Sequence, residues 1–178
     1  NKSPLHNKDG QVIGVLTSAV DITARKFAEE HRAHLALHDM LTGLPNRALL
    51  AEHMRQTIEE CSVTGSKAAL LLVDLDRFKI INDTRGHQAG DMLLRQVPER
   101  IHGALDANEL AARIGGDEFA VILRNVETPD DVSLKCLSLL GQIGQPYSIG
   151  DSDQLIGASI GIALIPDDGN SADELLRL

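Results

Sequence analysis

Aromatic residues are scarce in this sequence, which has no tryptophan, one tyrosine and three phenylalanines among 178 residues. Apolar residues nevertheless make up 43% of the chain, so we expect a substantial core built from aliphatic side chains. The length is typical of one domain with a short appendage.

Clusters of basic residues are lacking as well. The formal net charge is −9, and lysines and arginines are scattered along the chain. A surface that binds duplex nucleic acid needs concentrated positive charge, so we expect no nucleic-acid partner. A single nucleotide remains compatible with this composition, because metal ions and a few cations suffice to hold it.

Cysteine is rare, and long apolar runs are absent. Cys61 and Cys136 lie far apart and form no Cys-x-x-Cys pattern, which predicts two reduced thiols in a cytoplasmic protein. No apolar run approaches the length needed to span a bilayer, and no signal peptide is visible. We therefore expect this segment to make no direct membrane contact.

The first part of the chain differs from the rest. Asn7 to Gly10 is typical of a turn, residues 12–20 are strand-like, and Asp21-Ile22-Thr23 precedes a charged stretch. Residues 1–23 thus resemble the exit from a PAS sensory domain, with a local hairpin or a leader as the alternative. Residues 24–40 are predicted to form a linker helix that pairs with its twin in a dimer.

The most informative stretch is Ile114-Gly115-Gly116-Asp117-Glu118-Phe119. A Gly-Gly pair between two apolar runs predicts a tight hairpin, because glycine takes positive φ without steric cost. Asp117 and Glu118 should then lie at the mouth of the hairpin. Carboxylates held at a bend beside bare glycine backbone suit a metal ion that carries phosphate. Arg113 is expected to pair structurally with an acid near the hairpin.

A second pair of acids follows the strongest strand prediction. Residues 68–73 are continuously apolar, as expected for a strand buried on both faces, and they lead into Asp74-Leu75-Asp76. With a period of two, Asp74 and Asp76 share one face. Acids at the end of a buried strand are costly unless they are paired or bind metal. Arg77-Phe78-Lys79 and Asn82-Asp83-Thr84 then lead to a turn at Gly86, and no element is assigned to them.

The predicted elements give an order that defines the fold. A helix over 46–61 comes first and another opens at Ser171; between them lie strand 68–74, helix 88–105, strand 109–114, strand 118–123, helix 129–143 and strand 155–165. This βαββαβ order predicts an α+β, ferredoxin-like fold with an antiparallel sheet flanked by helices. The first strand and the hairpin then meet, so Asp74 and Asp117 should converge. Asp91 is expected in the first turn of helix 88–105, where the helix dipole favours an acid.

Several motifs in order carry a family resemblance. They are Asp39-Met40-Leu41-Thr42-Gly43-Leu44-Pro45-Asn46-Arg47, Asp74-Leu75-Asp76-Arg77-Phe78-Lys79, Ile81-Asn82-Asp83, Gly86-His87, Gly90-Asp91 and Arg113-Ile114-Gly115-Gly116-Asp117-Glu118-Phe119. Together they resemble the GGDEF-domain diguanylate cyclases, a bacterial family whose fold is similar to the catalytic domain of class III nucleotidyl cyclases. The resemblance covers about residues 39–178, and we expect the domain itself to span 41–178.

The resemblance implies a metal site and a catalytic group. Asp74 and Asp117 match metal ligands, with the Leu75 carbonyl as a further ligand, for two Mg²⁺ per active site that Mn²⁺ can replace. Glu118 matches the position that either binds the second metal or activates the 3′-hydroxyl of the substrate. Lys79 is placed with Asp117 and Glu118 in the catalytic set.

The resemblance also implies how GTP is held. Asn82 and Asp91 match the guanine-binding positions, while Phe78 and Lys79 match phosphate contacts. Gly115 and Gly116 leave a gap through which the triphosphate approaches. Two domains, each with one GTP, face each other as a homodimer and produce cyclic di-GMP and two pyrophosphates. The alternative is a GTP-binding regulatory module that controls an attached EAL-type phosphodiesterase domain.

Two departures from the family pattern matter. Many members carry Arg-x-x-Asp, a product-inhibition site, where this sequence has Asp106-Ala107-Asn108-Glu109. We therefore expect no inhibition through that site. The family also continues into a helix whose lysine and arginine contact phosphate, beyond the position of Leu178. We thus expect this sequence to be a piece of a longer protein, and the resemblance does not establish that this piece is active by itself.

Overall fold

A computed structural model describes residues 2–17, 21–23, 26, 34–150 and 152–176. The chain divides into two compact units, Asn1–His34 and Leu35–Leu178. In the described residues, no helix is both long enough and apolar enough to cross a membrane.

The first unit contains a two-stranded antiparallel hairpin of β1 (Lys2–His6) and β2 (Val12–Thr17). The Asn7 side-chain oxygen accepts hydrogen bonds from the backbone N–H groups of Asp9 and Gln11, at 3.0 and 2.8 Å, which closes the predicted turn. Most of the predicted linker helix, 24–25 and 27–33, lies outside the described residues.

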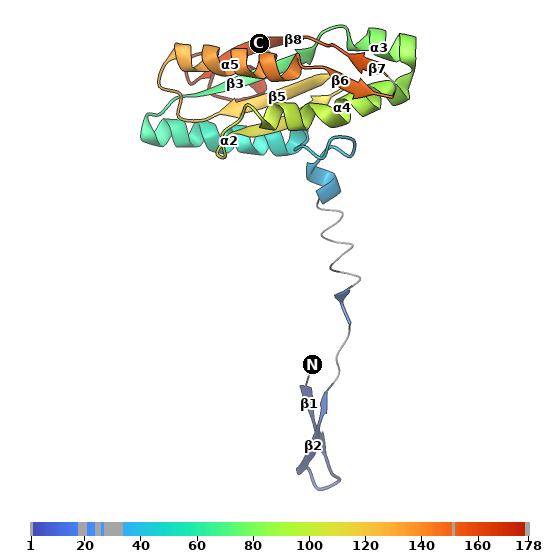
Figure 1. Cartoon of the computed structure of the whole chain (residues 1–178). Coiled ribbons are helices and arrows are strands. Elements are labelled where there is room, and N and C mark those ends of the chain that lie inside the picture. Colours follow the sequence, from blue (N-terminus) through green and yellow to red (C-terminus); the bar gives the residue numbers. More distant parts are fainter. Residues whose placement is uncertain (1, 18–20, 24–25, 27–33, 151, 177–178) are drawn as a thin grey trace. The chain divides into compact units, whose positions relative to one another are not determined.

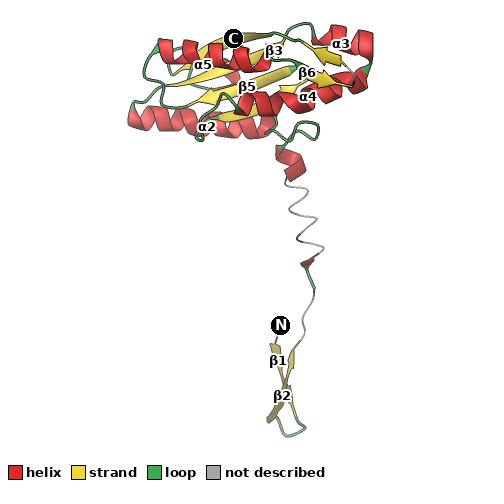
Figure 2. Cartoon of the chain, in the orientation of Figure 1, coloured by secondary structure: helices red, strands yellow, loops and turns green. Residues whose placement is uncertain are grey.

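The second unit is built on a four-stranded antiparallel sheet (Figure 2). Its strands are β3 (Ala68–Leu75), β4 (Leu110–Gly115), β5 (Glu118–Leu123) and β8 (Ala158–Ile165), in the order β4-β5-β3-β8. This order is the predicted ferredoxin-like one, with the first strand paired to the hairpin. The last strand is shorter than predicted, because it begins at Ala158 rather than at 155.

Helices cover both faces of this sheet (Figure 1). α4 (His87–His102) and α5 (Pro129–Ile143) share one core with alternate residues of β3, such as Leu71 and Leu75. α2 (Arg47–Thr64) and the short α6 (Ala172–Leu175) share a second core with Leu70 of the same strand. Because successive strand residues point to opposite faces, β3 separates the two cores and is buried by both.

Side-chain caps fix where three helices begin. Asn46 accepts hydrogen bonds from the first turn of α2, and Ser171 accepts one from the N–H of Glu174 in α6. The predicted cap at Thr128 is confirmed, and it forms a capping box with Asp131 at the start of α5.

Between β3 and β4 one element was missed and one prediction was wrong. A helix, α3 (Phe78–Arg85), occupies the stretch to which the sequence pattern assigned no element, and it buries Phe78 and Ile81. The next helix starts at His87, so Asp91 is its fifth residue and no acid lies in its first turn. The helix dipole therefore does not account for Asp91. A small hairpin of β6 (Tyr147–Ile149) and β7 (Ser152–Gln154) precedes β8.

Candidate active site

Three acids meet where β3 ends beside the β4–β5 hairpin. The strand register places Asp74 directly opposite Glu118. Asp117 lies in the tight turn, where Gly116 has a φ of 56°. The turn is tied to β3 by a hydrogen bond from the Leu75 N–H to the Asp117 carbonyl oxygen, at 3.3 Å. The structure thus brings together the two acidic segments whose convergence was predicted from the element order.

The negative charges of this cluster repel one another. Partial burial raises the pKa of Asp74, and the neighbouring carboxylates of Asp117, Glu118 and Asp76 raise it further. None of the three clustered acids forms an ion pair with the residues that the structure describes. A cation bound in this cluster would therefore be attracted to the carboxylates and would also reduce the repulsion between them.

The donor set fits a hard divalent cation such as Mg²⁺. Within the described ranges, no three His, Cys, Asp or Glu side chains form a ready-made metal centre. Mg²⁺ usually takes one or two carboxylates and completes its shell with water and substrate phosphates. The acids of this site therefore fit a cation that is shared with a phosphate ligand.

Asp76 is held by hydrogen bonds to the neighbouring segment at residues 157–159. One of its carboxylate oxygens accepts a hydrogen bond from the Ser159 hydroxyl at 2.7 Å. Its backbone N–H donates to the Gly157 carbonyl at 2.9 Å. A Cβ atom at Gly157 would lie only 2.6 Å from the other carboxylate oxygen of Asp76. Asp76 thus fastens the end of β3 to β8, which is a structural role.

The start of α3 offers groups that suit phosphate. Arg77 takes the N-cap position with a φ of 58° and provides no side-chain cap. The helix therefore begins with N–H groups that no described side chain satisfies, and such a terminus attracts anions. Lys79 is exposed in this first turn and pairs with none of the described residues. Phe78 is buried, so only its backbone is available to a ligand.

The two predicted base-binding residues lie where α3 packs on α4. A Cβ atom at Gly90 would lie 2.1 Å from the side-chain oxygen of Asn82, so the Asn82 amide rests directly against Gly90. Asp91, the next residue of α4, is exposed. Asn82 is half-buried, and its amide makes no hydrogen bond to the described part of the chain.

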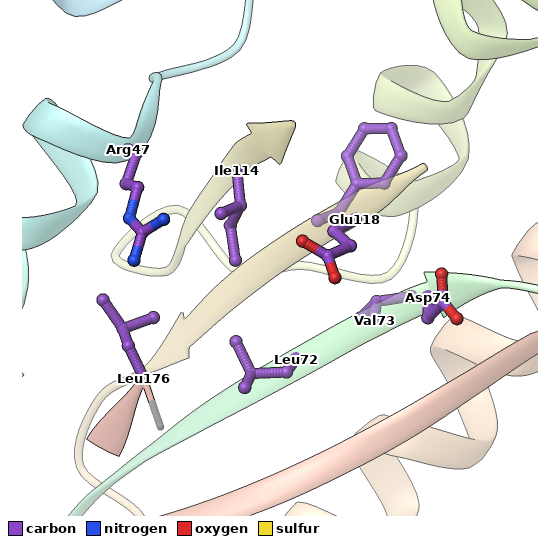
Figure 3. Close-up of a pocket in the computed structure, with 8 residues that line it drawn as sticks. Arg47, Leu72, Val73, Asp74, Ile114, Glu118 and Leu176 are labelled. Atoms are coloured by element: carbon purple, nitrogen blue, oxygen red, sulfur yellow. The ribbon is translucent and has the colours of Figure 1, made fainter. Parts of the chain in front are cut away.

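A cavity of about 190 Å³ lies beside the acids. Asp74 and Glu118 are among its lining side chains (Figure 3). Among the described residues that line it, Arg47 at the start of α2 is the one cation. A larger hollow of about 750 Å³ touches Asp74 from the α3 side. Neither is lined by Asn82, Asp91 or Asp117. Arg47 was not predicted as a site residue, and its place in the motif that ends Pro45-Asn46-Arg47 was its only signal in the sequence.

Arg113 ties the hairpin to the start of the unit. Its Nε and Nη2 atoms donate to the Gly116 carbonyl at 3.1 and 2.7 Å, and its Nη1 donates to Asp39 Oδ1 at 2.9 Å. Partial burial of Asp39 opposes its ionisation, but hydrogen bonds from Thr42 and Arg113 outweigh this and lower its pKa. The predicted structural pairing of Arg113 is confirmed, with a partner 74 positions away.

The sequence matches a known family over nearly all of this unit. A family model described as diguanylate cyclase, GGDEF domain, matches residues 36–178. The chain belongs to the GGDEF family. The match does not reach residues 1–23, so the PAS-like end of a preceding domain stays a prediction.

Relatives of this GGDEF domain include enzymes of cyclic di-GMP metabolism. The chain is 42% identical over 93% of its length to MucR of Pseudomonas aeruginosa, a bifunctional diguanylate cyclase and cyclic di-GMP phosphodiesterase, and it spans 25% of that protein. The curated relatives that it matches are thus several times longer.

Solved structures confirm the α+β fold. The GGDEF domain of TpbB from Pseudomonas aeruginosa has a TM-score of 0.76 and 37% identity, covering 79% of this chain and 82% of that one. The coiled coil and GGDEF domain of DgcB from Caulobacter crescentus, in complex with c-di-GMP, has a TM-score of 0.77 and 25% identity, covering 88% and 84% of the two chains.

Proposed function

We propose that this GGDEF domain condenses two molecules of GTP into cyclic di-GMP with release of two pyrophosphates. The observation that carries the proposal is that a pair of acids and the start of a helix without a side-chain cap lie at the same end of the sheet. Asp74 and Glu118 lie opposite each other and suit divalent cations. α3 begins at Phe78 without a side-chain cap and suits phosphate.

The triphosphate is held between these groups. Asp74, Asp117 and the Leu75 carbonyl hold one Mg²⁺ or Mn²⁺, and Glu118 contributes to a second. Bound cations of this kind neutralise the charge of the phosphates and of the leaving group. The N–H groups of Phe78 and Lys79 and the Lys79 ammonium contact phosphate oxygens. Gly115 and Gly116 carry no side chain that would obstruct the phosphates.

Asn82 and Asp91 select guanine. A carboxylate accepts two hydrogen bonds at once, and guanine presents adjacent N1–H and N2–H donors on its edge. Adenine presents no such pair, so Asp91 favours guanine over adenine. The Asn82 amide has both a donor and an acceptor, and neither is used by the described residues.

The reaction joins two nucleotides held by two domains. The 3′-oxygen of one GTP forms a bond to the α-phosphorus of the other, and the bond from that phosphorus to pyrophosphate breaks. Glu118 assists removal of the 3′-hydroxyl proton. The reciprocal step closes the ring of cyclic di-GMP. Because one domain holds one GTP, a homodimer is needed for catalysis.

We propose the same domain organisation as the sequence predicts. Residues 1–23 end a PAS-like sensory domain, 24–40 form the linker helix, and 41–178 form the catalytic domain, in the cytoplasm of a bacterium. A second role is favoured by another relative, NbdA of Pseudomonas aeruginosa, a cyclic di-GMP phosphodiesterase that is 37% identical over 80% of this chain. In that role the domain binds GTP and regulates an attached EAL-type phosphodiesterase domain.

The proposed reaction is tested by incubating the intact protein with GTP and Mg²⁺ and separating the products by chromatography. We expect cyclic di-GMP, and we expect Asp117→Ala to lower its rate at least about 100-fold, a loss typical of removing transition-state stabilisation. Asp130→Ala, at an exposed acid in the first turn of α5, is the matched control.

A dimeric preparation that binds GTP but forms no product would refute the hypothesis that the domain is a diguanylate cyclase. If GTP then changed the rate of cyclic di-GMP hydrolysis by the intact protein, the regulatory hypothesis would be supported. Unchanged turnover in Asp117→Ala would refute the metal assignment alone.

We expect no product inhibition through the segment that replaces Arg-x-x-Asp. Lys135 of α5 donates to Asp106 and to Glu109, at 2.9 Å each. Burial opposes the charge of this ammonium, but the two acids outweigh it and raise the pKa of Lys135. The segment is thus acidic and already paired, which disfavours a doubly anionic dinucleotide. Initial rates should be independent of added cyclic di-GMP; inhibition that Asp106→Ala or Glu109→Ala relieved would contradict this.

A further inference from the structure

Gly90 lies in α4, and the side chain of Asn82 occupies the space beside its Cα atom. A Cβ atom there would lie 2.1 Å from Asn82 Oδ1, and 3.0 Å from both Asn82 Cγ and Phe78 Cζ. Non-bonded carbon and oxygen atoms do not approach to 2.1 Å. The Asn82 amide therefore fills the space that any other residue at position 90 would need.

This contact has an unusual consequence for substitution. The Asn82 amide makes no hydrogen bond with the described residues, so it can turn to another rotamer without losing a partner. Alanine also forms helices better than glycine. An added methyl group at position 90 should therefore leave the fold intact, displace the Asn82 amide and shift the Phe78 ring by only a few tenths of an ångström.

We infer that Gly90 is a positioning residue for base recognition, because its bare Cα atom seats the Asn82 amide beside Asp91. The inference rests on the proposed function, in which Asn82 and Asp91 hold guanine. Asn82 comes from α3 and Asp91 from α4, so close packing of the two helices at Gly90 sets the spacing of the two base contacts.

The measurement is the binding of GDP and of ADP to the intact protein by calorimetry, because these ligands differ only in the base. We expect the unsubstituted protein to prefer GDP. Gly90→Ala should weaken GDP binding about tenfold, the usual loss for one base contact, and leave ADP binding unchanged. In steady-state assays the variant should raise KM for GTP more than it lowers kcat.

Gly141→Ala is the matched control. Gly141 lies inside α5, and a Cβ atom there would meet nothing within 4 Å. The Gly141→Ala variant should bind GDP and ADP with the same affinities as the unsubstituted protein. Thermal unfolding of both glycine variants shows whether either substitution disturbs the fold.

A double variant separates positioning from a general structural effect. If Gly90→Ala acts by displacing the amide, adding it to Asn82→Ala should cause no further loss of GDP affinity. The inference is overturned if Gly90→Ala binds GDP normally, or if it weakens GDP binding equally with and without Asn82. If the unsubstituted protein does not distinguish GDP from ADP, the guanine assignment of the proposed function fails and this inference fails with it.

Discussion

Replacing Asp74 by asparagine is expected to abolish formation of cyclic di-GMP and to make the folded domain slightly more stable. Asp74 lies directly opposite Glu118, and like charges in such cross-strand positions destabilise a sheet by about 0.2–1 kcal/mol. Asparagine has nearly the same shape but no charge. The melting temperature at neutral pH and without divalent cations should therefore rise by roughly 1–3 °C.

The pH dependence of this gain has a defined sign. The pKa of Asp74 is raised in the folded protein, so the folded state binds its proton more tightly than the unfolded state does. The stability that comes from this proton is present at low pH and is lost as the pH rises through the folded pKa. The melting temperature of Asp74→Asn should therefore be higher than that of the unsubstituted protein at neutral pH. The two melting temperatures should agree at a pH well below 3.8, the ordinary pKa of an aspartate.

Divalent cations provide a second readout that does not depend on turnover. Mg²⁺ with GDP should raise the melting temperature of the unsubstituted protein and raise that of Asp74→Asn much less. Asp130→Asn, an exposed acid of α5, is the control and should respond to Mg²⁺ like the unsubstituted protein. A variant that was active, or that was less stable at neutral pH, would show that Asp74 is not part of an uncompensated cation site.

The sheet and the hairpin could be predicted because their signals are local. The apolar run before Asp74 and the Gly115-Gly116 pair each identify an element, and the order of elements then determines which strands pair. α3 could not be predicted in this way. Ile80, Ile81 and Thr84 are β-branched and Asn82 and Asp83 favour turns, so the helix depends on packing rather than on propensity.

The same distinction applies to the candidate site. Asp74 and Glu118 meet because of strand topology, which the sequence pattern was able to indicate. The contact of Gly90 with Asn82 depends on α3 being a helix, and α3 was not predicted. The partner of Arg113 lies 74 positions away in a turn, and no periodicity connects Asp39 with the hairpin.

Replacing Arg113 by methionine is expected to cause the largest loss of stability among the changes considered. The Arg113 and Asp39 side chains are only 10% and 25% exposed, and methionine removes three hydrogen bonds and leaves Asp39 without its cation. Breaking a pair at this depth costs about 2–3 kcal/mol once partial solvent screening is allowed for. The melting temperature should fall by about 5–10 °C.

The pH dependence of this loss follows from Asp39. Its pKa is lowered in the folded protein, so its contribution to stability is present above the unfolded pKa and is lost as the pH falls through the folded pKa. The difference in melting temperature between Arg113→Met and the unsubstituted protein should therefore become smaller at acidic pH. Arg55→Met is the control, since Arg55 pairs with Glu52 on the exposed surface of α2, and its melting temperature should stay close to that of the unsubstituted protein.

Arg113→Lys distinguishes the charge of this residue from its geometry. Lysine keeps the attraction to Asp39, but it cannot donate at once to Asp39 and twice to the Gly116 carbonyl, as the planar guanidinium does. We therefore expect Lys to recover part of the stability and little of the activity, because the turn that carries Asp117 loses its support. Full recovery of both by lysine would show that only the charge matters and that the hairpin holds its shape without the arginine.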